Sequence, residues 1–239
     1  RQLGQLRALG AQLRRADKGT VIRALAAVSN LPPLTACEGD TQLDAFPLPT
    51  DPEIRSQVDV LRAKIDDARS LKDLGSYQEG VDLLVGVLAE AESLDYPPTA
   101  AEAAVLLGEL QEWAAQYEEA DVTFRRAILL AAKAHNDLLL VEAQARRVMV
   151  LGDRLKQASD GEALAEATVA LLERLGNPPR EAALLYTSWG AIKSDVRRDY
   201  DGAMAYMKKA LELNRQAFGP EHPDVASTLM NLGICAAGL

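Results

Sequence analysis

Few residues in this chain carry the side chains that catalysis or metal binding requires. The 239 residues include two histidines, His135 and His222, and two cysteines, Cys37 and Cys235. None of them stands at the spacing from a second nucleophile, base or ligand that a catalytic pair, a zinc site or a disulfide framework needs. The sequence therefore predicts no catalytic residue, no metal and no cofactor, and it predicts that this segment is not an enzyme.

Two pairs of adjacent acids, Asp66–Asp67 and Glu118–Glu119, are the remaining candidates for chemistry. Paired carboxylates serve general acid–base catalysis when their environments separate their pKa values. Here both pairs fall at helix starts or on predicted helix surfaces, where acids are common. We interpret them as solvated surface residues.

The charge balance excludes some classes of partner. The chain has 35 acidic and 26 basic residues and a net charge of -9, which repels a phosphate backbone, so we expect no nucleic acid partner. Arginine pairs such as Arg125–Arg126 and Arg197–Arg198 lie in predicted helices and are separated by acids, as on solvated helix faces. No apolar run approaches the length of about eighteen residues that marks a membrane span, so we expect no direct membrane insertion.

The elements that would position any site are helices. Residues 1–29 predict two amphipathic helices, and the proline-rich stretch that follows predicts a linker ending at Asp51–Pro52, a helix-start signal. We therefore divide the chain into an N-terminal helical cap with its linker, residues 1–52, and a helical array, residues 53–239.

The array consists of about four helix pairs and one unpaired helix. Capping-box patterns begin at Ser76, Thr99 and Ser159, and prolines fall between helices. The expected pairs are 53–74 with 77–94, 98–115 with 117–134, 137–157 with 160–175, and 179–198 with 200–217, followed by a single helix at 222–237.

A repeated steric pattern runs through these pairs. A small residue at Gly80, Ala120, Ala163 and Ala203 recurs at spacings close to forty residues. Two antiparallel helices approach closely where a glycine or alanine lies at their crossing point, so this pattern specifies packing. Such arrays generally bind other molecules and rarely catalyse reactions.

The clearest copy of the pattern resembles the tetratricopeptide repeat family, through Leu107–Gly108, Tyr117, Ala120, Phe124 and Ala127. The segment Ala217–Ala226, followed by Met230–Gly233, is similar to the kinesin-light-chain type of that repeat. The resemblance covers about residues 55–239. It implies an all-α fold, a right-handed α-solenoid of tetratricopeptide helix-turn-helix repeats with a small helical N-terminal cap, that acts as a protein-interaction scaffold.

The lead segment, from the Ala27–Cys37 loop to Asp51–Pro52, looks like the C-terminal region of bacterial serine/threonine protein kinases. This resemblance implies a regulatory or sensor region in signalling, with any kinase domain outside this segment. The side of the membrane stays open: cytoplasmic by default, or extracytoplasmic if a membrane span precedes the segment. In the second case Cys37 would be a plausible disulfide partner.

In such arrays the first helix of each pair lines the concave side, so ligand contacts are expected from first-helix residues that do not pack. Three acids at helical spacing would favour a basic or helical peptide, although a solvated face is the alternative. Asn231, by resemblance, stands where an amide meets a bound peptide backbone; it can equally stabilise its own helix. The predicted partner-binding groove comprises Glu102, Val105, Glu109, Glu112, Thr187, Ala191, Ser194, Met230, Asn231 and Ile234.

Two alternatives to binding of a protein or peptide ligand remain. The unpaired last helix carries Leu229, Leu232 and Ile234, which can pair with a second copy and form a homodimer. The groove can also hold a small molecule, which would make the chain a sensor.

Overall fold

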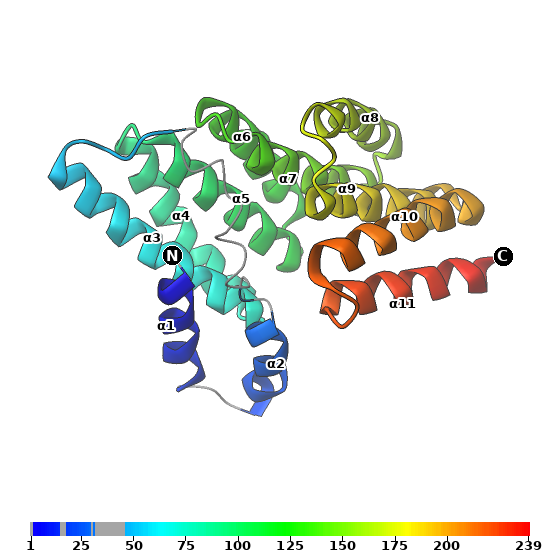
Figure 1. Cartoon of the computed structure of the whole chain (residues 1–239), viewed down its shortest axis with the longest axis horizontal. Coiled ribbons are helices and arrows are strands. Elements are labelled where there is room, and N and C mark those ends of the chain that lie inside the picture. The colour runs from blue at the N-terminus through cyan, green and yellow to red at the C-terminus, as the bar shows by residue number, and fades with distance from the viewer. Residues whose placement is uncertain (1, 15–17, 30, 32–45) are drawn as a thin grey trace. The chain divides into compact units, whose positions relative to one another are not determined.

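The computed structural model describes residues 2–14, 18–29, 31 and 46–239, and these residues form helices and turns with no strand among them (Figure 1). Cys37 and most of the predicted linker lie outside the described residues. Among the described helices, none is both long and apolar enough to cross a membrane.

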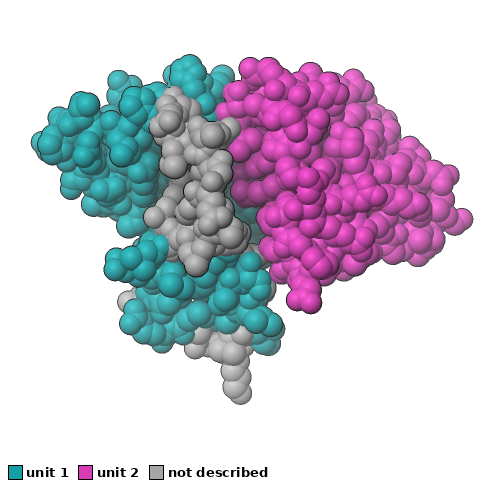
Figure 2. Space-filling view, in the orientation of Figure 1, with its two compact units in different colours: residues 1–119, 126–136 teal, residues 120–125, 137–239 magenta. Residues whose placement is uncertain are grey.

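The chain divides into two compact units (Figure 2). Unit 1 comprises residues 1–119 and 126–136, and unit 2 comprises residues 120–125 and 137–239. The sequence-based division at residue 52 separates the N-terminal cap from the helical array, and it stays a prediction.

Unit 1 is built from packed helices, and short turns join those that follow residue 52. The helices are α1 (Gln2–Leu13), α2 (Lys18–Ser29), α3 (Pro52–Asp73), α4 (Tyr77–Ser93), α5 (Pro97–Trp113) and part of α6 (Tyr117–Lys133). The predicted start of α3 is confirmed, because the Asp51 carboxylate accepts a hydrogen bond from the Glu53 amide at 2.8 Å, with Pro52 in the first turn.

Apolar faces of these helices form the core of unit 1. Leu61 and Ile65 of α3, Leu84 of α4 and Leu110 of α5 are almost fully buried. The predicted N-terminal helix pair is also present, and Arg23 of α2 donates a hydrogen bond to the Leu74 carbonyl at 3.2 Å. A cation at this point stabilises the carbonyl end of α3.

Unit 2 contains two further helix pairs and a last helix. Its elements are α7 (Asp137–Val148), η3 (Met149–Arg154), α8 (Ala158–Arg174), α9 (Pro179–Ala191), η4 (Ile192–Arg197), α10 (Tyr200–Phe218) and α11 (Pro223–Gly238). The first helices of both pairs, α7 and α9, thus end in the π-helical segments η3 and η4. The core of the unit gathers apolar residues of its first and second helices, among them Val141, Val148, Leu172, Leu185 and Ile192.

The third copy of the repeat is packed differently from the sequence-based alignment. Ala163 is exposed, whereas Gly161 is buried against η3. A Cβ on Gly161 would lie 2.6 Å from the Gly152 Cα, so the two backbones touch. The close-packing residue of this copy is therefore Gly161, and the prediction of Ala163 was wrong because the π-helical segment changes the register between the two helices.

The predicted capping boxes are wrong as well. Thr99 and Ser159 lie inside α5 and α8, and Ser76 occupies the N-cap position of α4 without a side-chain capping bond among the described residues. The turns between helices instead contain residues with a positive φ, which let the chain reverse direction. These residues are Gly75, Asp95, Ala115, His135, Lys156, Gly176, Asn177, Arg198 and Gly219.

Candidate partner-binding surface

The predicted groove residues of α5 divide into surface and core. Glu102 and Glu112 are half-buried, but Val105 and Glu109 are buried, with exposed fractions of 4% and 6%. The expectation that these two residues do not pack is therefore wrong. Valine and a carboxylate on one helix were taken for surface residues because a single helix pattern does not show how closely the neighbouring helices approach.

The negative charge of Glu109 is balanced by a lysine of α3. The Lys72 Nζ of α3 lies 2.8 Å from the Glu109 carboxylate and 3.8 Å from that of Asp73. Both side chains of the Lys72–Glu109 pair are largely buried, so the pair is part of the packing of unit 1. Of the three acids in the predicted stripe, Glu109 therefore belongs to the packing of unit 1, whereas Glu102 and Glu112 are half-buried.

Trp113, at the end of α5, is the most prominent exposed aromatic residue of unit 1. Its side chain is 57% exposed and stacks on Tyr77 at the start of α4, with ring centroids 5.8 Å apart. Beside it, the Gln116 side-chain amide donates to the Gln78 side chain at 2.9 Å. This corner of unit 1 thus presents a flat aromatic surface next to polar groups.

The predicted groove residues Thr187 and Ala191 lie on α9, and Ser194 lies in the π-helical segment η4 that follows it. Thr187 and Ala191 are half-buried, whereas Ser194, inside η4, is buried and donates its hydroxyl to the Asp195 carboxylate at 2.6 Å. A π turn contains more residues than an α turn, so residues after Ile192 rotate relative to a regular helix. The assumption of an α-helix to residue 198 placed Ser194 on the wrong face.

The last helix, α11, has one anchored and one exposed face. Val225, Thr228 and Cys235 are buried, and Thr228 accepts a hydrogen bond from Asn214 of α10 at 2.9 Å. The predicted groove residues Met230 and Ile234 are 63% and 53% exposed, and Asn231 is half-buried. An apolar surface with a side-chain amide is thus available on α11.

Sequence reasoning missed an aromatic cluster between α9 and α10. Trp189 and Tyr206 stack with ring centroids 4.7 Å apart, and Tyr206 also stacks on Tyr186 at 6.0 Å. Lys209 closes the cluster by donating to the Tyr186 hydroxyl at 2.7 Å. Burial raises the pKa of Tyr206. The three aromatic residues are visible in the sequence, but they come into contact only because α9 packs against α10.

Two glutamates of unit 2 have opposite electrostatic environments. Burial acts to raise the pKa of Glu162, but hydrogen bonds and charge from Arg197 and Lys193 together lower it. Arg197 lies at 2.7 Å and Lys193 at 3.0 Å from the Glu162 carboxylate. Glu181, in contrast, has its pKa raised by burial, despite the nearby charge of Arg180. These groups differ in which protonation state the folded protein favours.

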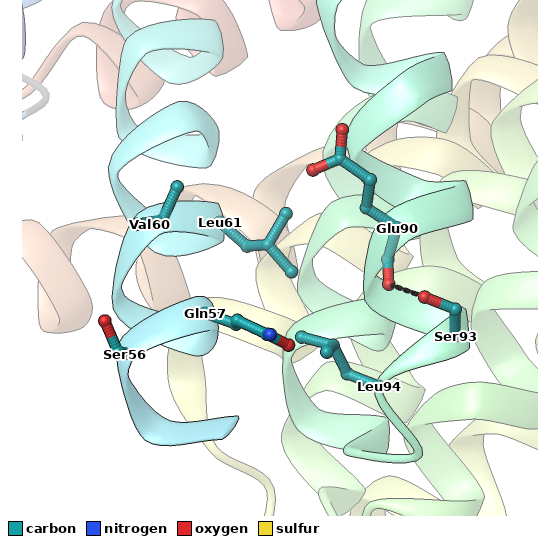
Figure 3. A pocket seen from close by; sticks show the side chains of 7 residues that line it. All are labelled: Ser56, Gln57, Val60, Leu61, Glu90, Ser93 and Leu94. Atoms are coloured by element: carbon teal, nitrogen blue, oxygen red, sulfur yellow. Dashed lines mark hydrogen bonds between the residues drawn. The ribbon is translucent and has the colours of Figure 1, made fainter. Parts of the chain in front are cut away.

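A small cavity of about 320 Å³ lies between α3 and α4 (Figure 3). Its lining is Ser56, Gln57, Val60, Leu61, Glu90, Ser93 and Leu94. Apolar side chains line much of it, and Ser93 donates to the Glu90 carbonyl at 2.7 Å, while Lys64 lies 2.7 Å from the Glu90 carboxylate at the rim. The cavity can accommodate an apolar side chain better than a charged ligand.

The residues considered for catalysis have structural roles. His222 Nδ1 accepts the Asp224 amide at 3.2 Å and its ring stacks on Phe218, while His135 occupies a turn in left-handed conformation. Within the described residues, no group of three histidine, cysteine or acidic side chains is arranged to hold a metal ion.

These packed helix pairs define the class of protein to which the chain is similar. The tetratricopeptide repeat family model matches residues 180–239, which contain α10, α11 and nearly all of α9. Tetratricopeptide repeats generally mediate protein–protein interactions and are typically scaffolds without enzymatic activity. No curated protein sequence is recognisably similar to the chain.

The solved structures narrow the likeness to kinesin-light-chain-like repeats. BtubC (BKLC) from P. vanneervenii superposes with a TM-score of 0.61 at 18% identity, over 78% of this chain and 75% of that one. Two structures of kinesin-light-chain TPR-like repeats from Podosopora anserina give TM-scores of 0.53 and 0.52 at 18% identity, over 76% of this chain and 87% of theirs. The predicted fold class, an all-α solenoid of tetratricopeptide repeats, is confirmed.

Proposed function

We propose that this chain is an interaction module that binds a peptide or protein segment on the surface of its first helices. The observation that carries the proposal is the division of those helices into packed and accessible residues. On α5 and α9, Glu102, Glu112 and Thr187 stay accessible beside buried neighbours, and on α11 Met230 and Ile234 are exposed. The likeness to tetratricopeptide repeats supports the same function.

The place of this module in a bacterial serine/threonine kinase, as a regulatory or sensor region, is also part of the proposal. Its support is the sequence likeness of residues 27–52. Reading the coding sequence upstream of Arg1 tests it directly. A kinase catalytic loop and a glycine-rich loop encoded there would support the proposal, and an unrelated upstream sequence would contradict it.

For unit 1 we propose a basic peptide as the ligand. Glu102 and Glu112 are half-buried acids of α5, and the exposed Trp113, which directly follows Glu112, can cover the aliphatic part of a lysine or arginine. Met230 and Ile234 of unit 2 would instead bind apolar side chains.

The test uses two matched amphipathic peptides that differ in having lysine or glutamate on the polar face. We expect the lysine peptide to bind more tightly, and the double variant Glu102→Gln/Glu112→Gln to weaken that binding by roughly three- to tenfold, less at high salt. Fluorescence anisotropy measures both affinities. The control Glu118→Gln/Glu119→Gln removes the same charge from exposed positions of α6 and should leave the affinity unchanged. Equal effects of both variants would contradict the proposed site.

Glu109 is deliberately left intact in that test. Its removal deprives the largely buried Lys72 ammonium of its 2.8 Å partner and leaves it the longer 3.8 Å contact with Asp73, so we expect Glu109→Ala to destabilise the protein by about 2 kcal/mol. Urea denaturation measures this effect, and Glu118→Ala, at an exposed site, is the matched control. A change of similar size in both variants would show that the Lys72–Glu109 pair does not contribute to stability.

Self-association and small-molecule binding, the two alternatives from the sequence, stay proposals with less support. The exposed Leu229 and Ile234 favour self-association, which sedimentation tests, because a monomer across all concentrations would contradict it. The other alternative, a small molecule held in the groove, is tested by thermal-shift measurements with a compound panel, and the absence of any shift would contradict it.

A further inference from the structure

Two arginines of α3, Arg62 and Arg69, lie on a face of that helix between its contacts with α1 and with α5. Both α1 and α5 pack on α3. On the α1 side, a Cβ built on Gly4 would lie 2.6 Å from the Asp66 carboxylate. On the α5 side, the Lys72 Nζ lies 2.8 Å from a carboxylate of α5. At about 3.6 residues per turn, both arginines come between Asp66 and Lys72 around the helix axis, so they project between α1 and α5.

The guanidinium groups of these two arginines have no acidic partner among the described residues. Both side chains are half-buried, and the Nε atom of each is buried without a hydrogen-bond partner. The nearest acids in the sequence are engaged elsewhere, because Asp66 is buried against α1 and Asp73 lies 3.8 Å from Lys72. Buried polar atoms are nearly always hydrogen-bonded in native proteins. This face of α3 is therefore suited to a ligand that supplies anionic acceptors.

The facing side of α1 adds an unpaired acceptor. Gln5 directly follows Gly4 and belongs to the buried stripe of α1 with Ala8 and Leu9. Its side chain is 9% exposed, and its Oε1 atom is buried without a hydrogen-bond partner in the described part of the chain. Unpaired donors on α3 and an unpaired acceptor on α1 thus lie on facing helices without bonding to each other. Such an arrangement leaves room for a polar group of a ligand to bond to both helices.

The next first helix, α5, carries the opposite charge at the equivalent positions. Glu102 and Glu109 follow Arg62 and Arg69 by forty residues, which is the spacing of the repeat. Glu109 belongs to the packing of unit 1, and Glu102 is half-buried. The surface that the first helices of unit 1 present thus changes from basic on α3 to acidic on α5. A ligand that suits both helices carries an anionic group next to a basic one.

We propose that Arg62 and Arg69 bind a phosphoserine or phosphothreonine of a peptide whose basic residue lies on α5. The inference rests on the proposed function, because it names a second charge on the same ligand. Two guanidinium charges are balanced by a phosphate group, which is close to a dianion at neutral pH, whereas a carboxylate supplies one charge. The three phosphate oxygens can accept from both arginines. Water would satisfy the hydrogen bonds but not the charges.

Helix geometry gives the spacing of the two charges in the ligand. The axes of packed helices lie about 8–10 Å apart. An extended chain advances about 3.3 Å per residue. A phosphorylated residue about three positions from a lysine or arginine therefore spans the distance from α3 to α5.

The experiment compares three labelled peptides that carry serine, phosphoserine or glutamate three positions from a lysine and are otherwise identical. By fluorescence anisotropy we expect the phosphoserine peptide to bind the chain about tenfold more tightly than the serine peptide, with the glutamate peptide between them. Arg62→Gln/Arg69→Gln should remove this advantage without weakening the serine peptide. Arg62→Lys/Arg69→Lys keeps the charges but not the planar forks, so it should retain only part of the advantage.

The matched control is Arg174→Gln/Arg180→Gln, which removes two positive charges from exposed side chains of unit 2. It should leave the affinities of all three peptides unchanged. Circular dichroism and thermal melting check that the variants fold. Because Arg62 and Arg69 have no described partner, we expect their variants to melt at the temperature of the parent chain.

The other outcomes contradict the inference. Equal affinities for the phosphoserine and serine peptides would overturn it, as would an equal loss in the unit 2 control. A glutamate peptide that binds as tightly as the phosphoserine peptide would show that one charge suffices, which excludes a phosphate-specific site. Failure of the proposed function has a different signature: Glu102→Gln/Glu112→Gln would then leave the serine peptide unaffected while the advantage of phosphoserine persists.

Discussion

The first helices of the two units end in different ways, and the difference controls their packing. In unit 1, α3 and α5 are α-helical to their last residue and cross their partners with ordinary side chains between them. In unit 2, α7 and α9 continue into η3 and η4, and the Gly152 and Gly161 backbones come into direct contact. Unit 2 thus accommodates a longer repeat by widening its last helical turn.

The largest expected effect comes from filling the glycine contact of unit 2. In Gly161→Ala the added Cβ would meet the Gly152 backbone, which cannot rotate away, so we expect a loss of about 3 kcal/mol in the free energy of unfolding. In unit 1, Gly80→Ala meets the methyl groups of Leu110 at 2.8 Å and 2.9 Å, which can yield, so about 1 kcal/mol is expected. Urea denaturation compares the two variants. Equal losses would mean that the units pack by the same rules.

Two glutamates of unit 2 should make its stability depend on pH in opposite directions. The lowered pKa of Glu162 gives stability that is present above the unfolded-state pKa, about 4.3, and is lost as pH falls through the folded-state pKa. The raised pKa of Glu181 has the opposite sign, so its ionisation destabilises the fold as pH rises through the folded-state pKa.

At neutral pH we therefore expect Glu162→Gln to lower, and Glu181→Gln to raise, the urea midpoint. The difference for Glu181→Gln should shrink as pH falls below about 4, where the carboxyl group is protonated in folded and unfolded chains alike. The difference for Glu162→Gln should shrink only as pH falls through the lowered folded-state pKa of Glu162. Denaturation across this pH range is the measurement. A midpoint lowered by both variants would show that Glu181 is stabilised by contacts stronger than its desolvation.

The smallest effect concerns the left-handed turns that both units share. Ala115 in unit 1 has a φ of 60°, and Asn177 in unit 2 has a φ of 56°. Alanine tolerates this conformation poorly, whereas asparagine visits it readily, so Ala115→Gly should stabilise the protein by about 0.5 kcal/mol and Asn177→Gly by less. Thermal unfolding under identical conditions ranks them. A larger increase in stability for Asn177→Gly than for Ala115→Gly would contradict the expectation that alanine is the more strained residue.

Much of the fold could be predicted because its signals are local. The start of α3 follows from Asp51 and Pro52, and the helix boundaries follow from apolar periodicity, glycines and prolines. The capping boxes failed for a related reason: a serine or threonine three residues before a glutamate also occurs inside a helix, as Thr99 and Ser159 do. Short patterns are therefore reliable where two signals coincide and unreliable alone.

The candidate surface was harder to predict, because accessibility depends on neighbours far away in the sequence. Glu109 is buried since Lys72, on another helix, reaches it. Ser194 is buried since η4 widens after Ile192. Neither fact can be read from the helix that carries the residue. Met230 and Ile234, in contrast, are exposed, because α11 packs mainly on α10 and these two residues lie on other sides of the helix.

By itself, then, the amino-acid sequence determined that this chain is a series of paired helices, because hydrophobic period and turn residues act over a few positions. The tertiary structure decided where glycine meets glycine, which acids lie in the core and which face of α11 remains open. Those properties depend on the distance between two helices, and that distance is set by all the side chains packed between them at once.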